Sequence, residues 1–235
     1  MKISIITAFP ELMRSYLAAS VLGRGIAAGR LEVCVIDIRD FAEGDYRQID
    51  DYCYGSGGMM LMAEPLSKAL ASVSAAAKPY VVYPSPQGTH LYQELVEDLS
   101  RREHLAIICG HYEGVDERFT QKYVDMEISL GDFVLTGGEM PAMAIVDAVS
   151  RLIPGVVGNN SSVTEDSFYS GMLDTPHYTR PAAWQGERVP EVLMNGDAKA
   201  IDRWRRRRSV ERTLDRRPDL AARAGIIPWL SGGAY

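Results

Sequence analysis

Three turns rich in glycine and proline constrain this chain most, because each directly follows a short apolar run typical of a β-strand. The turns read SLGDFVLTGGE at residues 129–139, YPSPQG at residues 83–88 and GHYEGVDER at residues 110–118. Glycine permits positive φ and lets a backbone approach a ligand closely. In open α/β sheets, ligands bind on such turns at the carboxyl ends of the strands. The three turns therefore predict one composite pocket.

The rest of the N-terminal part alternates between strand and helix patterns. Such alternation predicts a mainly parallel sheet that is covered by helices on both faces. We expect strands at residues 3–7, 31–38, 80–83, 104–109 and 126–130, and helices at residues 10–28, 65–77, 91–102, 115–124 and 140–153, with a long polar loop at residues 45–58. The first strand is followed by no GxGxxG pattern, and the chain has no GxxxxGK[ST] pattern. Dinucleotide-binding Rossmann chemistry and P-loop chemistry are therefore disfavoured.

The composition fits a globular protein of the cytoplasm. Hydrophobic residues make up 46% of the 235 residues, and no apolar run is long enough to span a bilayer. The first strand pattern is broken too early, at Phe9 and Pro10, for a signal peptide. Three scattered cysteines predict no disulfide framework. Cys109 and His111 lack a second pair of ligands, so we predict no metal site.

Charge is distributed unevenly along the chain. The formal net charge is −6, yet residues 203–217 hold eight arginines. We expect a first domain at residues 1–158, a polar and flexible linker at 159–167 and a small helical domain at 168–235, with helices at residues 197–216 and 219–225. Trp204 shares a near-helical spacing with Ile201 and Leu214, which predicts that it belongs to the core of this domain.

Motifs along nearly the whole chain resemble one enzyme family. They read ITAFP at residues 6–10, YPSPQG at 83–88, CGHYEGVDER at 109–118, SLGDFVLTGGE at 129–139, DAVSRLIPGV at 147–156, EDSF at 165–168 and PHYTRP at 176–181. In this order they are similar to the bacterial tRNA (guanine-N1)-methyltransferases of the SPOUT class, which methylate guanosine 37 beside the anticodon. The resemblance implies a deep trefoil knot, S-adenosylmethionine as methyl donor, an obligate homodimer with shared active sites, and Mg²⁺ as an activator.

One loop departs from the family pattern. The family usually has DDxPYGGGxGM here, whereas residues 50–60 of this chain read DDYCYGSGGMM. Cys53 replaces a proline, and Ser56 and Met59 each replace a glycine. The backbone geometry of the family's loop therefore does not carry over directly.

The resemblance assigns most of the three turns to the cofactor. Backbone groups of Leu130 to Leu135, with Gly137 and Gly138, would hold adenine, and Glu113 would approach the cationic end of the cofactor. The simpler alternative is that these glycines only make tight strand-to-helix turns. The predicted cofactor-binding residues are Tyr83, Pro84, Ser85, Pro86, Gly110, Tyr112, Glu113, Ser129, Leu130, Gly131, Asp132, Phe133, Val134, Leu135, Gly137, Gly138 and Pro141.

Two residues are expected to catalyse the reaction. Guanine N1 carries a proton at neutral pH, so a base must remove that proton as the methyl group is transferred. The resemblance places Asp166 in this role. Arg151 would stabilise the negative charge that develops on guanine O6. Without the resemblance, Asp166 would be one acid of a solvated linker and Arg151 a cation favoured at a helix C-terminus.

The arginine cluster is the expected contact with tRNA. Arginine side chains bind phosphates, although a run of arginines is otherwise usually a solvated helix face. The predicted tRNA-binding residues are His177, Arg180, Arg205, Arg206, Arg207 and Arg208. Two other functions remain open: ribose 2′-O-methylation by the same fold, and a non-catalytic RNA-binding module. The first fits the cofactor turns but not Asp166 together with the long basic C-terminal domain, and cofactor binding would separate the second from an enzyme.

Overall fold

The computed structural model describes residues 1–55, 57–75, 78–158 and 166–226. The chain divides into two compact units, Met1–Asn160 and Ser161–Tyr235. Residues 159–165, which make up most of the predicted flexible linker, lie outside the described residues.

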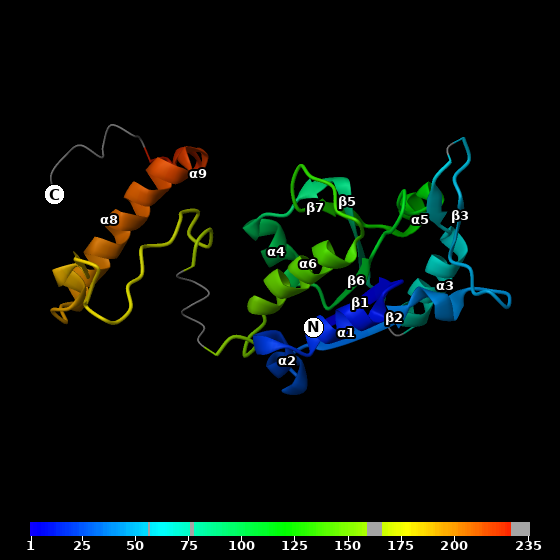
Figure 1. Ribbon diagram of the computed structural model, residues 1–235, viewed down its shortest axis with the longest axis horizontal. Coiled ribbons are helices and arrows are strands. Elements are labelled where there is room, and N and C mark those ends of the chain that lie inside the picture. Colours follow the sequence, from blue (N-terminus) through cyan, green and yellow to red (C-terminus); the bar gives the residue numbers. More distant parts are fainter. Residues whose placement is uncertain (56, 76–77, 159–165, 227–235) are drawn as a thin grey trace. The chain divides into compact units, whose positions relative to one another are not determined.

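A five-stranded sheet forms the centre of the first unit (Figure 1). Its strands are β1 (Lys2–Thr7), β2 (Glu32–Asp37), β5 (Tyr80–His90), β6 (His104–Ile108) and β7 (Met126–Ser129). They lie in the order β2-β1-β6-β5-β7, and every neighbouring pair is parallel. β6 is buried along its whole length, as expected for an apolar central strand. The predicted parallel α/β fold is confirmed.

Helices cover both faces of this sheet, because the sheet buries apolar side chains on each side. One core cluster joins the sheet to α1 (Pro10–Leu17), α2 (Ser20–Ala27), α4 (Gln93–Ser100) and α6 (Glu139–Arg151). The other cluster joins it to α3 (Ala63–Ser74), α5 (Glu117–Tyr123) and the short 3-10 helix η1 (Ile38–Phe41). Because the strands are parallel, their carboxyl ends lie at one edge of the sheet, near the three turns rich in glycine and proline.

Three sequence predictions about this unit were wrong. The helix expected at residues 10–28 is divided into α1 and α2, because Ala19 is extended and Ser20 has a φ of 57°. An α-helix does not continue through such a conformation. The polar loop expected at residues 45–58 is partly a hairpin of β3 (Asp50–Tyr52) and β4 (Met59–Leu61). The strand expected at residues 80–83 is also longer, since β5 runs to His90 with a shift in its register against β7.

The second unit is built around α8 (Ala198–Arg216) and α9 (Pro218–Arg223). Asp197 caps α8 by accepting hydrogen bonds from the backbone N–H groups of Lys199 and Ala200. The unit also contains the short strand pair β8 (Ala183–Trp184) and β9 (Glu187–Arg188), and the 3-10 helix η2 (Glu191–Leu193).

Trp204 is half-buried, whereas the sequence predicted a buried core residue at this position. Its ring lies 6.3 Å from the ring of Tyr178, and the guanidinium of Arg208 lies 6.0 Å from its centroid. Among the described residues of this unit, the two that are almost fully buried are Ala221 and Thr213, and Leu220 is the one large apolar residue that is also buried. Trp204 therefore packs at the margin of the unit, where its ring supports an arginine.

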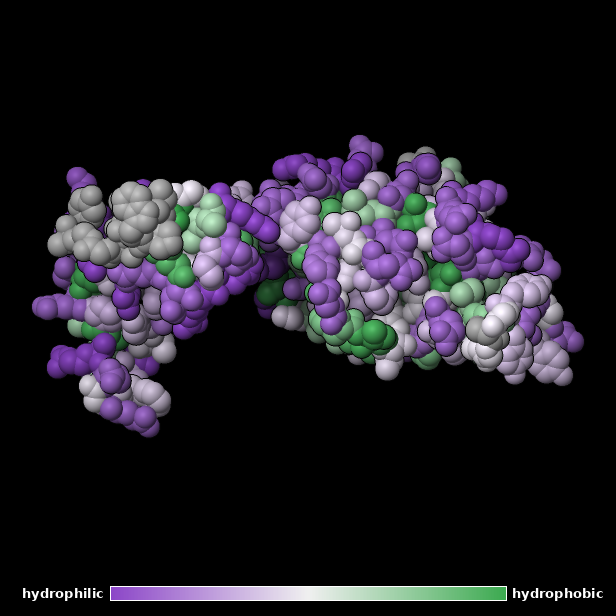
Figure 2. Space-filling model, turned by 90° about the horizontal axis from the view of Figure 1, so that it is seen from above, coloured by the Kyte–Doolittle hydropathy of each residue, from purple (hydrophilic) through white to green (hydrophobic). Residues whose placement is uncertain are grey.

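Surface character follows from this arrangement. Figure 2 shows a face that is mostly hydrophilic, with apolar residues in separate small groups. Among the described residues, no helix combines the length and the apolar character that a membrane span requires.

Candidate functional site

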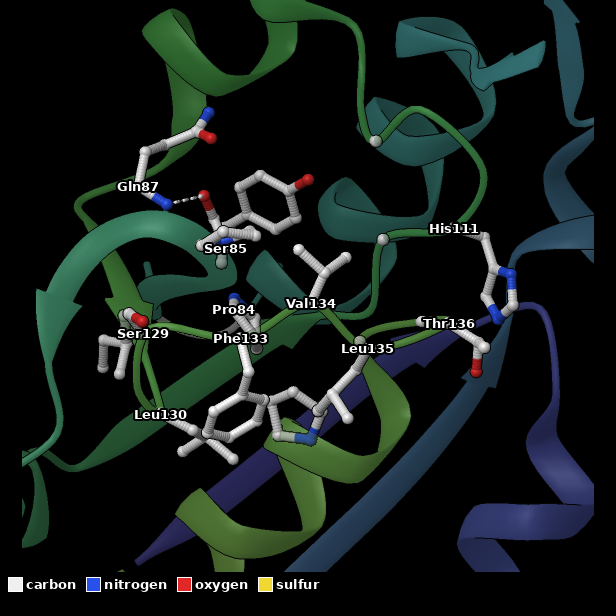
Figure 3. A pocket seen from close by; sticks show the side chains of 18 of the residues that line it. Pro84, Ser85, Gln87, His111, Ser129, Leu130, Phe133, Val134, Leu135 and Thr136 are labelled. Atoms are coloured by element: carbon white, nitrogen blue, oxygen red, sulfur yellow. Dashed lines mark hydrogen bonds between the residues drawn. The ribbon is translucent and has the colours of Figure 1, made fainter. Parts of the chain in front are cut away.

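The three glycine-rich and proline-rich turns meet around one cavity of about 290 Å³ (Figure 3). Two of them follow β6 and β7, and the turn at residues 83–88 lies within β5, where the register against β7 shifts between Pro84 and Thr89. β6, β5 and β7 are neighbours in the sheet. Parallel strands end at the same edge, so turns far apart in the sequence become walls of one pocket. The sequence feature that predicted a composite pocket therefore corresponds to a real cavity.

The pocket contains the predicted cofactor-binding residues with one exception. Asp132 does not line the cavity; its exposed carboxylate lies 3.0 Å from Nε2 of His90. Five further residues line the pocket that sequence reasoning did not name: Gln87, His111, Gly114, Ile128 and Thr136. Four of them belong to the motifs that identified the turns and could have been included on that ground. Ile128 is the last apolar residue of β7 before the turn and gave no separate signal.

The side chains divide the pocket into two ends. Figure 3 shows Leu130 and Phe133 together at one end, and His111 beside Thr136 at the other. Tyr83 forms a wall between the turns and is itself buried. Burial, with the negative charge of Glu127, raises the pKa of the Tyr83 hydroxyl above its usual range. The hydroxyl therefore remains a neutral hydrogen-bonding group at neutral pH.

Two glycines allow the turns to approach each other at the floor of the pocket. A Cβ atom on Gly138 would lie 2.7 Å from the backbone N of Gly110, and one on Gly110 would lie 2.9 Å from the Tyr83 ring. The backbone N–H of Gly138 donates to the carbonyl of Gly110 at 2.8 Å. Side chains at these positions would separate the two turns, so glycine is required here for close approach.

The β3–β4 hairpin docks against the turn that follows β6. Backbone N–H groups of Leu61 and Glu113 donate to the carbonyls of Gly114 and Met59, each at 3.0 Å. A Cβ atom on Gly58 would lie 2.4 Å from Cγ of Glu113, so the Glu113 side chain packs directly on that glycine. The loop that departs from the family pattern therefore supports the predicted partner of the cofactor's cationic end.

Arg151 lies apart from this pocket, at the C-terminal end of α6. It lines a second cavity of about 280 Å³ between α6 and the α1–α2 region, together with Tyr16, Asp147 and Ser150. Burial raises the pKa of Tyr16, and the charge and hydrogen bonding of Asp147 raise it further. This cavity therefore holds a neutral phenol beside a carboxylate and a guanidinium.

Asp166 is the first described residue of the second unit and is half-buried. The turn after it is held by hydrogen bonds. The N–H of Asp174 donates to Oγ of Ser167 at 2.9 Å, and the N–H of Phe168 donates to the carbonyl of Met172 at 2.7 Å. The aspartate therefore begins an ordered turn.

Arg205, Arg206, Arg207 and Arg208 of the predicted tRNA contact are all exposed along α8. Arg207 and Arg208 lie 2.7 and 2.8 Å from the carboxylate oxygens of Glu211, and Arg206 lies 3.5 Å from Asp202. Hydrogen bonding from Arg207 lowers the pKa of Glu211, although partial burial opposes it. A guanidinium has five donors, so these pairs leave donors that can bind phosphate.

Of the two other predicted tRNA contacts, His177 is exposed and lies 2.6 Å from Oδ2 of Asp174. Burial raises the pKa of Asp174, but hydrogen bonds from His177 and Thr175 outweigh it, so the net shift is downward. Arg180 is exposed. Within the described residues, no group of three or more His, Cys, Asp or Glu side chains is arranged to hold a metal ion.

The fold and the pocket define an α/β protein with a cavity at the carboxyl edge of a parallel sheet. Comparison with known proteins identifies the family. The family model described as tRNA (guanine-1)-methyltransferase matches residues 1–223, which include both units. The chain therefore belongs to this family, which is of the SPOUT class, and the resemblance drawn from the motifs is confirmed.

Named relatives agree with this assignment. A tRNA (guanine-N(1)-)-methyltransferase of Moorella thermoacetica is 49% identical over 232 residues, which cover 97% of this chain and 93% of the relative. One of Magnetococcus marinus is 50% identical over 231 residues, covering 96% and 91%. One of Ruminiclostridium cellulolyticum is 46% identical over 223 residues, covering 94% and 96%. Membership of this family makes the chain a methyltransferase with S-adenosylmethionine as methyl donor.

Proposed function

We propose that this protein transfers a methyl group from S-adenosylmethionine to N1 of guanosine 37 in tRNA. The observation that carries the proposal is the single pocket formed by the three turns, in a chain whose family match covers both units. The named relatives are guanine-N1 methyltransferases of tRNA, which supports the same base and the same class of RNA here.

The residues around the pocket fit S-adenosylmethionine. Residues 130–138 form neither helix nor strand apart from one β-bridge at Gly137. Many of their backbone N–H and C=O groups are therefore not used in regular secondary structure and can form hydrogen bonds with adenine. Glu113 supplies a carboxylate for the cationic end of the cofactor. When bound, the cofactor supplies an electrophilic methyl group on a sulfonium ion, and the N1–methyl bond forms as the sulfur–methyl bond breaks.

Asp166 is the proposed general base. The N1 proton of guanine passes to its carboxylate as N1 becomes the nucleophile. An ordinary aspartate is a weak base, so the chemistry requires that the negative charge left on the guanine is stabilised elsewhere.

Arg151 is the proposed source of that stabilisation. Its guanidinium remains charged throughout the reaction and would face O6, on which negative charge develops. The cavity beside it offers hydrogen-bonding groups from Tyr16, Asp147 and Ser150 that can fix the guanidinium plane. Arg151 and Asp166 belong to different units, so the proposal requires that both units contribute to the site at the target base when tRNA is bound.

The second unit is the proposed tRNA-binding domain, and α8 is its main contact surface. The exposed arginines at positions 205–208, with His177 and Arg180, offer positive charge to the phosphates near the anticodon. The first unit would then be the cofactor-binding domain and would contain the trefoil knot that the family resemblance implies.

The proposed assembly is a homodimer in the cytoplasm, with active sites shared between the two chains. Four residues at the pocket turn and the start of α6 expose apolar side chains: Phe133, Val134, Leu135 and Met140. Val134 is 83% exposed, which is unusual for an apolar residue beside a binding pocket and supports cover by a second copy. Mg²⁺ is expected only from the family resemblance.

A methyl-transfer assay on tRNA transcripts tests this function. The protein should methylate a transcript that has guanosine at position 37 and should not methylate a matched transcript with adenosine there. Mapping the product by reverse transcription distinguishes N1 methylation, which blocks base pairing, from ribose 2′-O-methylation, which does not. Methylation at another position or at the ribose would contradict the proposal.

A further inference from the structure

Glu139 is a buried carboxylate that the proposed chemistry does not use. It is the first residue of α6, only 4% of its surface is exposed, and it comes directly after the glycines of the pocket turn. A buried carboxylate is costly unless other groups pair with it. Partners of the Glu139 carboxylate must therefore compensate for the cost of burying it.

Each carboxylate oxygen of Glu139 has a partner from a different part of the sheet edge. Oε1 accepts a hydrogen bond of 2.7 Å from Oγ1 of Thr7, the last residue of β1. Oε2 lies 3.2 Å from Nε2 of His111, in the turn after β6. One carboxylate thus connects the end of β1, the turn after β6 and the start of α6.

The surroundings of this carboxylate hold it in place. Oγ1 of Thr7 also accepts a hydrogen bond of 2.9 Å from the N–H of Phe9, so the threonine is fixed on both sides. The ring of Phe9 lies 4.7 Å from the ring of His111 and covers it. Burial raises the pKa of the Cys109 thiol well above its usual range, and the charge of Glu139 raises it further. The thiol beside Glu139 therefore stays neutral.

The pair of His111 and Glu139 lies directly behind the pocket turn. A Cβ atom on Gly137 would lie 2.4 Å from Nε2 of His111 and 2.7 Å from Oε2 of Glu139. The backbones of His111 and Gly137 form a β-bridge, and His111, Gly137 and Gly138 all line the pocket. The side-chain pair and the backbone bridge therefore join the same two turns.

We propose that Glu139 and His111 are a pair of positioning residues that hold the two pocket turns at the separation that S-adenosylmethionine requires. The inference rests on the proposed function of this pocket and adds residues that were not predicted to contact the cofactor. The charge-assisted contact fixes the turn at residues 130–138 from behind, and thereby fixes the backbone groups that would hold adenine. Without this contact the turns would separate, and cofactor binding would weaken.

Substitutions that change one contact at a time test the pair. Glu139→Gln keeps an amide oxygen that can accept from Thr7, but it places a neutral group opposite His111. His111→Ala removes the other partner, and His111→Gln offers a side-chain N–H in its place. Glu64→Gln is the matched control, because Glu64 lies in the first turn of α3 and its contact with Lys68 is exposed.

The measurement is the dissociation constant of S-adenosylmethionine by calorimetry, with KM and kcat for methyl transfer to tRNA. We expect Glu139→Gln and His111→Ala each to weaken cofactor binding about tenfold, the size of one hydrogen bond to a charged group. The double variant should be no weaker than either single variant, because both remove the same interaction. The KM for the cofactor should rise while kcat at saturating cofactor stays unchanged, and His111→Gln should recover part of the affinity.

The outcomes separate this proposal from the proposed function. Failure of the unsubstituted protein to bind S-adenosylmethionine would overturn the function of the pocket. Normal binding in that protein, with equal affinity in Glu139→Gln and His111→Ala, would overturn the pair even if both variants melt at a lower temperature. Additive reductions of affinity in the double variant would also overturn it. If Glu139→Gln fails to fold, the less buried His111→Ala and His111→Gln variants still decide the question.

Discussion

Leu173 donates its backbone N–H to Oγ1 of Thr213 at 3.0 Å, although 40 residues separate them. Thr213 is fully buried, and its hydroxyl donates to the carbonyl of Ser209 at 2.7 Å. Ser209 in turn donates to the carbonyl of Leu173 at 2.5 Å. The turn that begins at Asp166 is therefore fastened to α8, the same helix that presents the arginine cluster. The proposed base therefore begins a segment that is hydrogen-bonded to the helix of the proposed tRNA contact surface.

Thr213→Val should loosen this segment. Valine has nearly the same shape but leaves the N–H of Leu173 without its side-chain acceptor, so we expect the free energy of unfolding to fall by about 1–3 kcal/mol. All three tryptophans lie in residues 161–235, so tryptophan fluorescence during urea denaturation reports on this unit. Thr179→Val, at an exposed position, is the control. Equal stability of the Thr213 and Thr179 variants would show that the contact does not hold the turn.

Asp166→Asn should abolish most methyl transfer without affecting cofactor binding. Asparagine keeps the size of the side chain but cannot accept the N1 proton, and loss of one positioned base typically lowers the rate about 10²- to 10⁴-fold. Single-turnover rates with saturating tRNA and calorimetry with S-adenosylmethionine are the two measurements. A rate close to that of the unsubstituted protein would remove Asp166 from the role.

The arginines on α8 should control the affinity for tRNA and leave cofactor binding unchanged. With Arg205, Arg206, Arg207 and Arg208 all replaced by alanine, fewer counterions are released on binding. The slope of log affinity against log salt should then flatten by about 0.7–0.9 for each phosphate that the protein no longer neutralises. Arg101→Ala, which removes an exposed arginine of the first unit, is the control. An unchanged slope in the quadruple variant would mean that the cluster does not face the RNA.

The strand-to-helix alternation and the pocket could be predicted because both follow from local pattern. Apolar runs that end in glycine-rich turns predict parallel strands, and the shared edge of such strands brings the turns together. Asp197, which begins the predicted helix at residues 197–216, is the N-cap of α8. These features need no knowledge of distant contacts.

The pair of Glu139 and His111 could not be predicted, because it depends on strand order. Glu139 meets Thr7 only because β1 lies beside β6 in the sheet, and no local pattern specifies that neighbour. In the sequence, Glu139 is an ordinary acidic residue in the first turn of a helix. Ser20 was missed for a related reason: nothing in the apolar spacing around it indicates the positive φ that divides α1 from α2.

The Cys109 thiol should contribute to stability in a limited range of pH. Its pKa is raised by burial and by Glu139, so above the ordinary value of 9.0 the unfolded chain loses a proton that the folded protein keeps. The contribution of Cys109 to the free energy of unfolding should therefore be constant below pH 9 and should fall as the pH rises from there. Between pH 9 and 10 the buried Tyr83, with an ordinary value of 10.0, contributes little.

Urea denaturation at several pH values measures this effect. Cys109→Ala should remove the decline between pH 9 and 10, whatever its effect on stability at neutral pH. A thiol reagent should modify the half-buried Cys34 and Cys53 in the native protein and should reach Cys109 only on unfolding. Rapid modification of three thiols in the native state would contradict the burial on which the prediction depends.

The last prediction concerns the shared sites of the proposed homodimer. If the cofactor pocket and Arg151 of one chain work with Asp166 of the other, each chain can lack a different part and the dimer can still form one intact site. Gly137→Ala disables the pocket, because the added Cβ would lie within 2.7 Å of His111 and Glu139. Asp166→Asn disables the base. Each variant alone should be inactive, whereas a heterodimer of the two should recover up to about half the activity of the unsubstituted dimer, since one of its two sites is intact.

Differently tagged chains, co-expressed and purified through both tags, give that heterodimer. Two controls fix the interpretation: a heterodimer of tagged Asp166→Asn chains should stay inactive, and a tagged heterodimer of unsubstituted chains should be fully active. If sites are not shared, one chain of the mixed dimer lacks its pocket and the other lacks its base, so the verified mixed dimer would show no activity.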